Sequence, residues 1–182
     1  MVEKMWKVRK SEKLIDNRWL SVQKNSVEIS NGMCIDDFYT VTIPDAAAIV
    51  ALTKDNDLIL KREYKYAADE ELIEIPAGMF EPEEHDGLEV AKRELLEETG
   101  YVSDDWMYFG DTVESSSKLT NRMHIYIAKN CYKIAEQKLD ATEELDVLVV
   151  PITEAVEMVM RNEIKCNSSA HGILRAARLI GV

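Results

Sequence analysis

The stretch of sequence that decides the fold of this chain is "RELLEETG", which runs from Arg93 to Gly100. Four of its eight residues carry a charge, and three of the four are glutamates. Like charges three or four residues apart repel one another and destabilise a helix. A helix that keeps Glu94, Glu97 and Glu98 together therefore needs a compensating positive charge nearby.

A single helix from about Gly87 to Thr99 is expected to carry these glutamates. Asp86 is a good N-cap, and Gly100 stands where a left-handed C-cap would fall. At 100° per residue, three apolar residues share the face that would meet a sheet: Leu88, Ala91 and Leu95.

The charges on this helix are expected to balance only in part. Arg93 can pair with Glu89 and with Glu97, each four residues away. Glu94 and Glu98 are then left without a compensating cation in the helix. Two neighbouring carboxylates form the oxygen-rich arrangement that Mg²⁺ or Mn²⁺ prefers, so the pair predicts a divalent metal site.

Length and composition indicate one principal domain. With 182 residues and 46% hydrophobic content, the chain can bury one good core and at most a small appended sheet. The N-terminus carries charges where a signal peptide needs an apolar core, and no apolar run is long enough to span a bilayer, so a cytoplasmic protein without membrane contact is expected. A net charge of −12 argues against nucleic-acid binding but permits polyphosphates held through metal ions. The three widely spaced cysteines indicate neither a disulfide framework nor a zinc site.

The remaining sequence alternates strand and helix signals and predicts a mixed α+β domain. The first third has the pattern of antiparallel strands, with Asn31-Gly32 as a hairpin turn. Later strands are expected over residues 46–52, 57–64, 123–128 and 146–152. Two helices, over about 153–162 and 169–180, end the chain.

The segment "GMFEPEEHDGLEVAKRELLEETGY", from Gly78 to Tyr101, closely resembles the Nudix box, G-x5-E-x7-R-E-U-x-E-E-x-G-U, in which U is a bulky apolar residue. The fixed positions are supplied in order by Gly78, Glu84, Arg93, Glu94, Leu95, Glu97, Glu98, Gly100 and Tyr101. One residue more than in the family pattern separates Glu84 from Arg93, which leaves Glu83 as an alternative to Glu84. His85 is the expected insertion, in an exposed loop.

From about Trp19 to the C-terminus, the chain looks like the branch of this superfamily that contains ADP-ribose and nucleoside-diphosphate-sugar pyrophosphatases. The resemblance implies an α/β/α sandwich, with a mixed sheet between flanking helices and an N-terminal antiparallel sheet as an extension. Residues 1–44 would form the extension and join two subunits in a homodimer, and residues 45–182 would form the Nudix hydrolase domain. The implied reaction is hydrolysis of a nucleotide sugar, such as ADP-ribose or GDP-mannose, to a nucleoside monophosphate and a sugar phosphate.

The resemblance also implies Mg²⁺ or Mn²⁺ as the cofactor. Its expected ligands are Glu94, Glu98 and the carbonyl oxygen of Ala77. Glu97 would be a further ligand or a water-orienting group held by Arg93.

A general base is implied in the later acidic loop "DATEELDV". Glu143 is favoured there over Glu144, and a loop that is merely solvated is the alternative interpretation.

Substrate contacts are implied at four positions. Trp19 would stack on the base, with a place in the core or the dimer interface as the alternative. Lys65 stands where relatives carry an arginine on the phosphates, and Tyr39 and Met79 complete the expected contacts. Relatives specific for ADP-ribose carry a proline near the position of Ser116, so hydrolysis of several nucleotide sugars is expected here.

Two other functions remain open. One is a house-cleaning hydrolase of nucleoside triphosphates or dinucleotides, which the long N-terminal β segment argues against. The other is a non-catalytic sensor of a nucleotide sugar, which the complete set of box glutamates argues against. No nucleophile elbow surrounds Ser115 to Ser117, and His124 is expected to be a strand residue.

Overall fold

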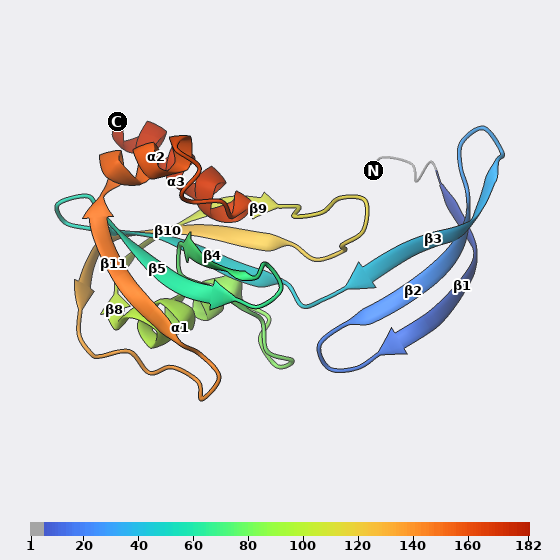
Figure 1. Cartoon of the computed structure of the whole chain (residues 1–182), viewed down its shortest axis with the longest axis horizontal. Helices are drawn as coiled ribbons and strands as arrows, with labels where there is room; N and C mark the ends of the chain where they lie inside the picture. The colour runs from blue at the N-terminus through green and yellow to red at the C-terminus, as the bar shows by residue number, and fades with distance from the viewer. Residues whose placement is uncertain (1–5) are drawn as a thin grey trace. The chain divides into compact units, whose positions relative to one another are not determined.

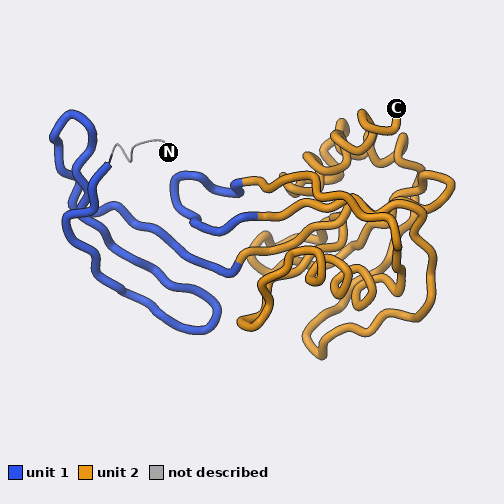
Figure 2. Tube along the Cα trace, turned by 180° about the vertical axis from the view of Figure 1, so that it is seen from behind, with its two compact units in different colours: residues 1–44, 113–122 blue, residues 45–112, 123–182 orange. Residues whose placement is uncertain are grey.

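The structure is a computed structural model that describes residues 6–182, and the chain forms two compact units (Figure 2). The first unit consists of Met1–Pro44 and Val113–Arg122. The second consists of Asp45–Thr112 and Met123–Val182. The first unit therefore includes a segment that lies far from the N-terminal strands in the sequence.

The described part of the first unit holds a three-stranded antiparallel sheet in the order β1 (Lys7–Asp16), β2 (Ser21–Glu28), β3 (Cys34–Thr42). The turn between β2 and β3 contains Gly32 with a φ of 86°, as expected from the Asn-Gly hairpin signal. Segment 113–122 binds the end of β3, because the Val41 N–H donates to the Lys118 carbonyl at 2.8 Å.

The second unit is built on an eight-stranded mixed sheet. Its central path runs β11 (Leu145–Pro151), β5 (Asp57–Lys65), β4 (Ala46–Thr53), β10 (Met123–Lys133), β8 (Tyr101–Val102). Three further strands pair with members of this path: β6 (Glu70–Glu74) with β5, β7 (Ala77–Met79) with β4, and β9 (Asp105–Thr112) with β10. The β4–β10 pair is parallel, and the other pairs are antiparallel.

Helices cover both faces of this sheet (Figure 1). The helix α1 (Gly87–Thr99) packs on one face, and α2 (Ile152–Met160) and α3 (Asn167–Ile180) pack on the other. Because both faces are covered, seven consecutive apolar residues of β4 are buried. The architecture is the expected α/β/α sandwich, and the fold-class prediction is confirmed.

The helix α1 has the predicted bounds and caps. Its N-cap Asp86 accepts a hydrogen bond from the Leu88 N–H at 2.9 Å, and Gly100 ends it with a φ of 76°. Val90, Ala91 and Leu95 on its inner face are fully buried against the sheet. This packing fixes the position of α1, and therefore of its glutamates, relative to the sheet.

Several strands and helix ends differ from expectation. The sequence patterns do not predict a strand over β1, β6, β7, β8 or β9. The helix α2 ends at Met160 rather than near Asn162, and α3 begins at Asn167 rather than near Ser169. Within residues 6–182, no helix is long and apolar enough to cross a membrane.

Candidate active site

Glu94 and Glu98 are buried next to the short strand β7, where only 8% and 3% of their surfaces are exposed. Glu98 Oε2 accepts a hydrogen bond from the Ala77 N–H at 3.0 Å. A Cβ on Gly78 would lie 1.9 Å from Glu94 Oε1, so the glycine leaves the space that this carboxylate fills. The buried flank of α1 therefore meets β7 through two carboxylates.

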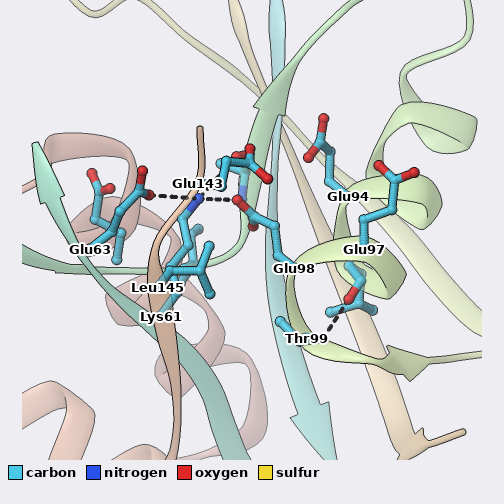
Figure 3. Close-up of polar contacts among 12 residues, drawn as sticks. Lys61, Glu63, Glu94, Glu97, Glu98, Thr99, Glu143 and Leu145 are labelled. Carbon is cyan, nitrogen blue, oxygen red and sulfur yellow. Dashed lines mark hydrogen bonds and ion pairs between the residues drawn. The ribbon is translucent and has the colours of Figure 1, made fainter. Parts of the chain in front are cut away.

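Lys61 on β5 supplies the positive charge beside Glu98 (Figure 3), and no sequence pattern predicts a role for it. Its Nζ donates to Glu98 Oε1 and, at 3.2 Å, to the carbonyl oxygen of Ala77. Glu63 Oε2 lies 3.7 Å from the same nitrogen. Lys61 is therefore bonded to two of the expected metal-binding groups.

Arg93 fastens α1 to the loop that precedes it. Its Nε and Nη2 donate to the two carboxylate oxygens of Glu84 at 2.9 and 3.0 Å, and Nη2 also reaches the Met79 carbonyl at 3.3 Å. This two-pronged contact matches the planar guanidinium to a carboxylate. Glu84, rather than the exposed Glu83, is thus the box glutamate that binds Arg93.

The expected pairing of charges within α1 is partly wrong. Arg93 does bind Glu97, at 3.1 Å, but it also lies 2.7 Å from Glu94, which was expected to lack a helical cation. Glu89 pairs with Lys92 at 2.7 Å and not with Arg93. Glu84, from the loop before the helix, binds the Nε and Nη2 edge of the Arg93 guanidinium, and Nη1 lies beside Glu94 and Glu97.

A cavity of about 360 Å³ in the second unit brings together six residues predicted for the site. These are Lys65, Ala77, Met79, Glu94, Glu98 and Glu143. Arg93 and Glu97 do not line it. Trp19 and Tyr39 belong to the first unit, where both are exposed and the Arg18 guanidinium lies 4.1 Å from the centre of the Trp19 ring.

Glu143 and Lys65 are held at this cavity by local contacts. Glu143 Oε2 accepts from the Asp140 N–H at 2.9 Å, which closes the turn before β11. Lys65 Nζ lies 2.5 Å from Glu63 and 3.7 Å from Glu74. Glu144 lines only a neighbouring cavity, of about 760 Å³, which contains no glutamate of α1.

Burial is the main influence on the two carboxylates. It raises the pKa of Glu94, against the nearby Arg93, and it raises the pKa of Glu98 to about 7, against Lys61. A further positive charge placed between them would favour their ionised forms.

The donor set fits a hard divalent cation. Carboxylates of Glu94 and Glu98 and a backbone carbonyl at Ala77 are the oxygen ligands that Mg²⁺ and Mn²⁺ take. Gly78 provides room for the Glu94 carboxylate that a larger residue would fill. Among residues 6–182, no group of three or more acidic, histidine or cysteine side chains is arranged to hold a metal ion.

Comparisons with known proteins identify the family to which the chain belongs. The family model for the NUDIX domain matches residues 42–167. The chain is 30% identical to the methanol dehydrogenase activator of Bacillus methanolicus over 159 residues, which cover 87% of this chain and 85% of that protein. It is 26% identical to the ADP-ribose pyrophosphatase of Bacillus subtilis (strain 168) over 163 residues, 89% of this chain and 87% of the relative.

The fold is also found among solved structures. The crystal structure of an ADP compounds hydrolase superposes with a TM-score of 0.83 over 98% of this chain and 95% of that chain, at 21% sequence identity. The family match covers most of the chain and includes β7, α1 and the loop between them. The chain therefore belongs to the Nudix family, in the branch that contains the ADP-ribose pyrophosphatases, and is a Nudix pyrophosphatase.

Proposed function

We propose that the chain hydrolyses the diphosphate bond of nucleoside-diphosphate sugars, such as ADP-ribose or GDP-mannose, to a nucleoside monophosphate and a sugar phosphate. The observation that carries this proposal is the convergence of Glu94, Glu98 and the Ala77 carbonyl on a cavity that Lys65 also lines. The relative from Bacillus subtilis that is named an ADP-ribose pyrophosphatase supports the substrate class.

In this proposal Glu94, Glu98 and the Ala77 carbonyl hold Mg²⁺ or Mn²⁺. When bound, such an ion neutralises phosphate charge and lowers the pKa of a bound water. Glu97 is a further ligand or orients the attacking water, and its bond to Arg93 fixes its position.

The other cavity residues act on the substrate and on the water. Glu143 accepts the proton of the attacking water, and Lys65 binds phosphate oxygens as a point charge, without the two-pronged grip of an arginine. Met79 contacts the bound nucleotide through its exposed side chain. Trp19 and Tyr39, in the N-terminal extension, serve base recognition in a cytoplasmic homodimer.

A panel of substrates tests the proposed function. ADP-ribose, GDP-mannose, UDP-glucose, a dinucleoside polyphosphate and a nucleoside triphosphate are each incubated with Mg²⁺, with Mn²⁺ and with a chelator, and the products are identified. We expect hydrolysis of several nucleotide sugars with kcat/KM values within about a hundredfold of one another, because Lys65 offers little directional selectivity. Chelation should stop all of it.

Two results would contradict the proposal. One is a triphosphate or dinucleotide preferred by more than about a thousandfold, which would indicate a house-cleaning hydrolase. The other is tight binding of a nucleotide sugar with no turnover under any metal condition, which would indicate a sensor.

A second candidate is regulation of another enzyme, favoured by the 30% identity to a protein named methanol dehydrogenase activator. It is tested by measuring methanol dehydrogenase turnover with and without this chain. Stimulation by the active protein would support this role, and the absence of any effect would remove it.

A further inference from the structure

Lys61 is a buried lysine within the main sheet, and the proposed reaction gives it no role. It lies in the middle of β5, with 3% of its surface exposed. Strand alternation places it on the same face as Ile59, which packs against α1. An ammonium group in such a place is strongly unfavourable unless carboxylates and carbonyls surround it.

Two of the three partners of Lys61 are oxygens that a metal ion would use, and Figure 3 shows its contacts with Glu98 and with Glu63. Its Nζ contacts Glu98 Oε1 and the Ala77 carbonyl, while the other oxygen of Glu98 accepts from the Ala77 N–H. Of the three proposed ligands, only Glu94 makes no contact with this ammonium among the described interactions.

The charge on Lys61 is secured by its surroundings. The carboxylate of Glu98 contacts its Nζ directly, and Glu63 Oε2 lies 3.7 Å from the same nitrogen. Two ion-pair partners therefore compensate the buried positive charge.

We propose that Lys61 is a built-in cation of the active site, which occupies the position between Glu98 and the Ala77 carbonyl, so that a divalent ion reaches these two groups only in competition with the ammonium. The competition rests on the proposed function, because the same groups are its proposed metal ligands. Lys61 thereby stabilises the metal-free site. It raises the metal concentration at which the site is half occupied, compared with a site that lacks this ammonium. It is a positioning residue that acts through Glu98.

The test is metal binding, measured without substrate. Isothermal titration calorimetry and the loss of the free Mn²⁺ signal in electron paramagnetic resonance give the affinity and the number of bound ions. The Lys61→Met variant keeps the length of the side chain and removes its charge. It should bind Mn²⁺ at least about tenfold more tightly, which is about 1.4 kcal/mol, or bind one additional ion.

Lys65→Met is the matched control. This residue lies on the same strand and lines the same cavity, but its ion-pair partners are Glu63 and Glu74. Because Lys65 is also half-exposed, its removal should change Mn²⁺ affinity by no more than about threefold. Equal gains in the two variants, or unchanged or weaker binding in a folded Lys61→Met protein, would overturn the proposal.

A measurement on the unmodified protein covers the case in which Lys61→Met does not fold. In ¹⁵N-lysine-labelled protein, a buried hydrogen-bonded ammonium gives a resolved signal, which Lys61→Arg identifies by its disappearance. Saturating Mg²⁺ should shift or abolish this signal, and a signal that Mg²⁺ leaves unchanged would overturn the proposal.

The proposed function and this inference fail separately. If Lys61→Met binds Mn²⁺ more tightly but no nucleotide sugar is hydrolysed, only the proposed function falls. If nucleotide sugars are hydrolysed with metal but removal of Lys61 leaves metal binding unchanged, only the role of Lys61 falls.

Discussion

Gly78 determines where the carboxylate of Glu94 can lie. The side chain of Glu94 fills the space in which a Cβ at position 78 would stand, and the nearest atom of that side chain would be 1.9 Å away. The obstacle is the far end of a flexible side chain, so a larger residue at 78 would move the carboxylate rather than break the fold. Gly78 is therefore expected to matter more for the position of the Glu94 carboxylate than for the stability of the fold.

We predict that Gly78→Ala reduces kcat/KM by at least about a hundredfold, because a displacement of Glu94 by roughly 1 Å or more would misplace a proposed metal ligand. The melting temperature of the metal-free protein should fall by only a few degrees, or about 1 kcal/mol. Steady-state kinetics and thermal unfolding of the same preparation check both. Full activity in Gly78→Ala would mean that the position of Glu94 does not matter.

The residues of the box could be predicted from the sequence, whereas the partners from outside it could not. Glu94 and Glu98 are predictable because their helical spacing and the motif reinforce each other. Lys61 is not, because a lysine normally indicates an exposed position, and its burial depends on the packing of α1 over β5. The available signal was strand alternation, which places Lys61 on the same face as the fully buried Ile59.

At the scale of elements, the loop before α1 is tied to the helix by one guanidinium. Arg93 bonds to both oxygens of Glu84 and to the Met79 carbonyl. Arg93 also holds down the pKa of Glu84, against the opposing effect of burial. The contact thus fixes the end of β7 relative to the glutamates of α1.

We predict that Glu84→Gln lowers the free energy of unfolding by about 1 kcal/mol at pH 7, since it removes the charge from a two-pronged, partly exposed contact. The folded-state pKa of Glu84 lies below its ordinary value of 4.5, so its ionised form contributes stability above that pH and the contribution is lost as pH falls through the folded pKa. Urea unfolding of both proteins from about pH 3 to pH 7 checks this. A difference that grows toward acid pH would contradict the sign of the effect.

Helices and strands whose ends or buried faces leave a pattern in their own sequence could be predicted. Strands that are defined only by hydrogen bonding to a neighbouring strand could not. The cap residues Asp86 and Gly100 mark both ends of α1 in the sequence, because each has the side chain or the backbone freedom that its cap requires. The strand β9 contains Gly110 with a φ of 103° and is defined by its register with β10 rather than by alternation of its own. In β1, all ten residues are exposed, so no buried face produces a pattern.

At the scale of the whole molecule, the N-terminal sheet carries apolar side chains on an exposed strand. Val8, Leu14 and Ile15 of β1 are between 47% and 65% exposed. A three-stranded sheet needs a buried apolar face for independent stability, and these side chains of β1 are not buried within the chain. This is the physical basis for proposing that residues 1–44 join two copies of the chain.

We predict that the protein is a homodimer in light scattering at micromolar concentration. The double variant Val8→Asp/Ile15→Asp should be a monomer with lower activity, because charge on β1 opposes burial of that strand between subunits. Lys10→Asp in the same strand adds a negative charge without removing an apolar side chain and serves as the control. A fully active wild-type monomer would refute the dimer.

The central claim concerns the activity of the whole enzyme, namely that it hydrolyses nucleotide sugars through a metal ion held by the buried glutamates of α1. The most direct measurement is kcat/KM on the best nucleotide sugar with Mg²⁺, for Glu98→Gln and for Glu89→Gln. Glu89 lies on the same helix, but it is exposed and pairs only with Lys92 among the described contacts. We predict a loss of at least about a thousandfold for Glu98→Gln, or roughly 4 kcal/mol, and no loss for Glu89→Gln. A folded Glu98→Gln protein within about tenfold of the wild-type rate would contradict the account.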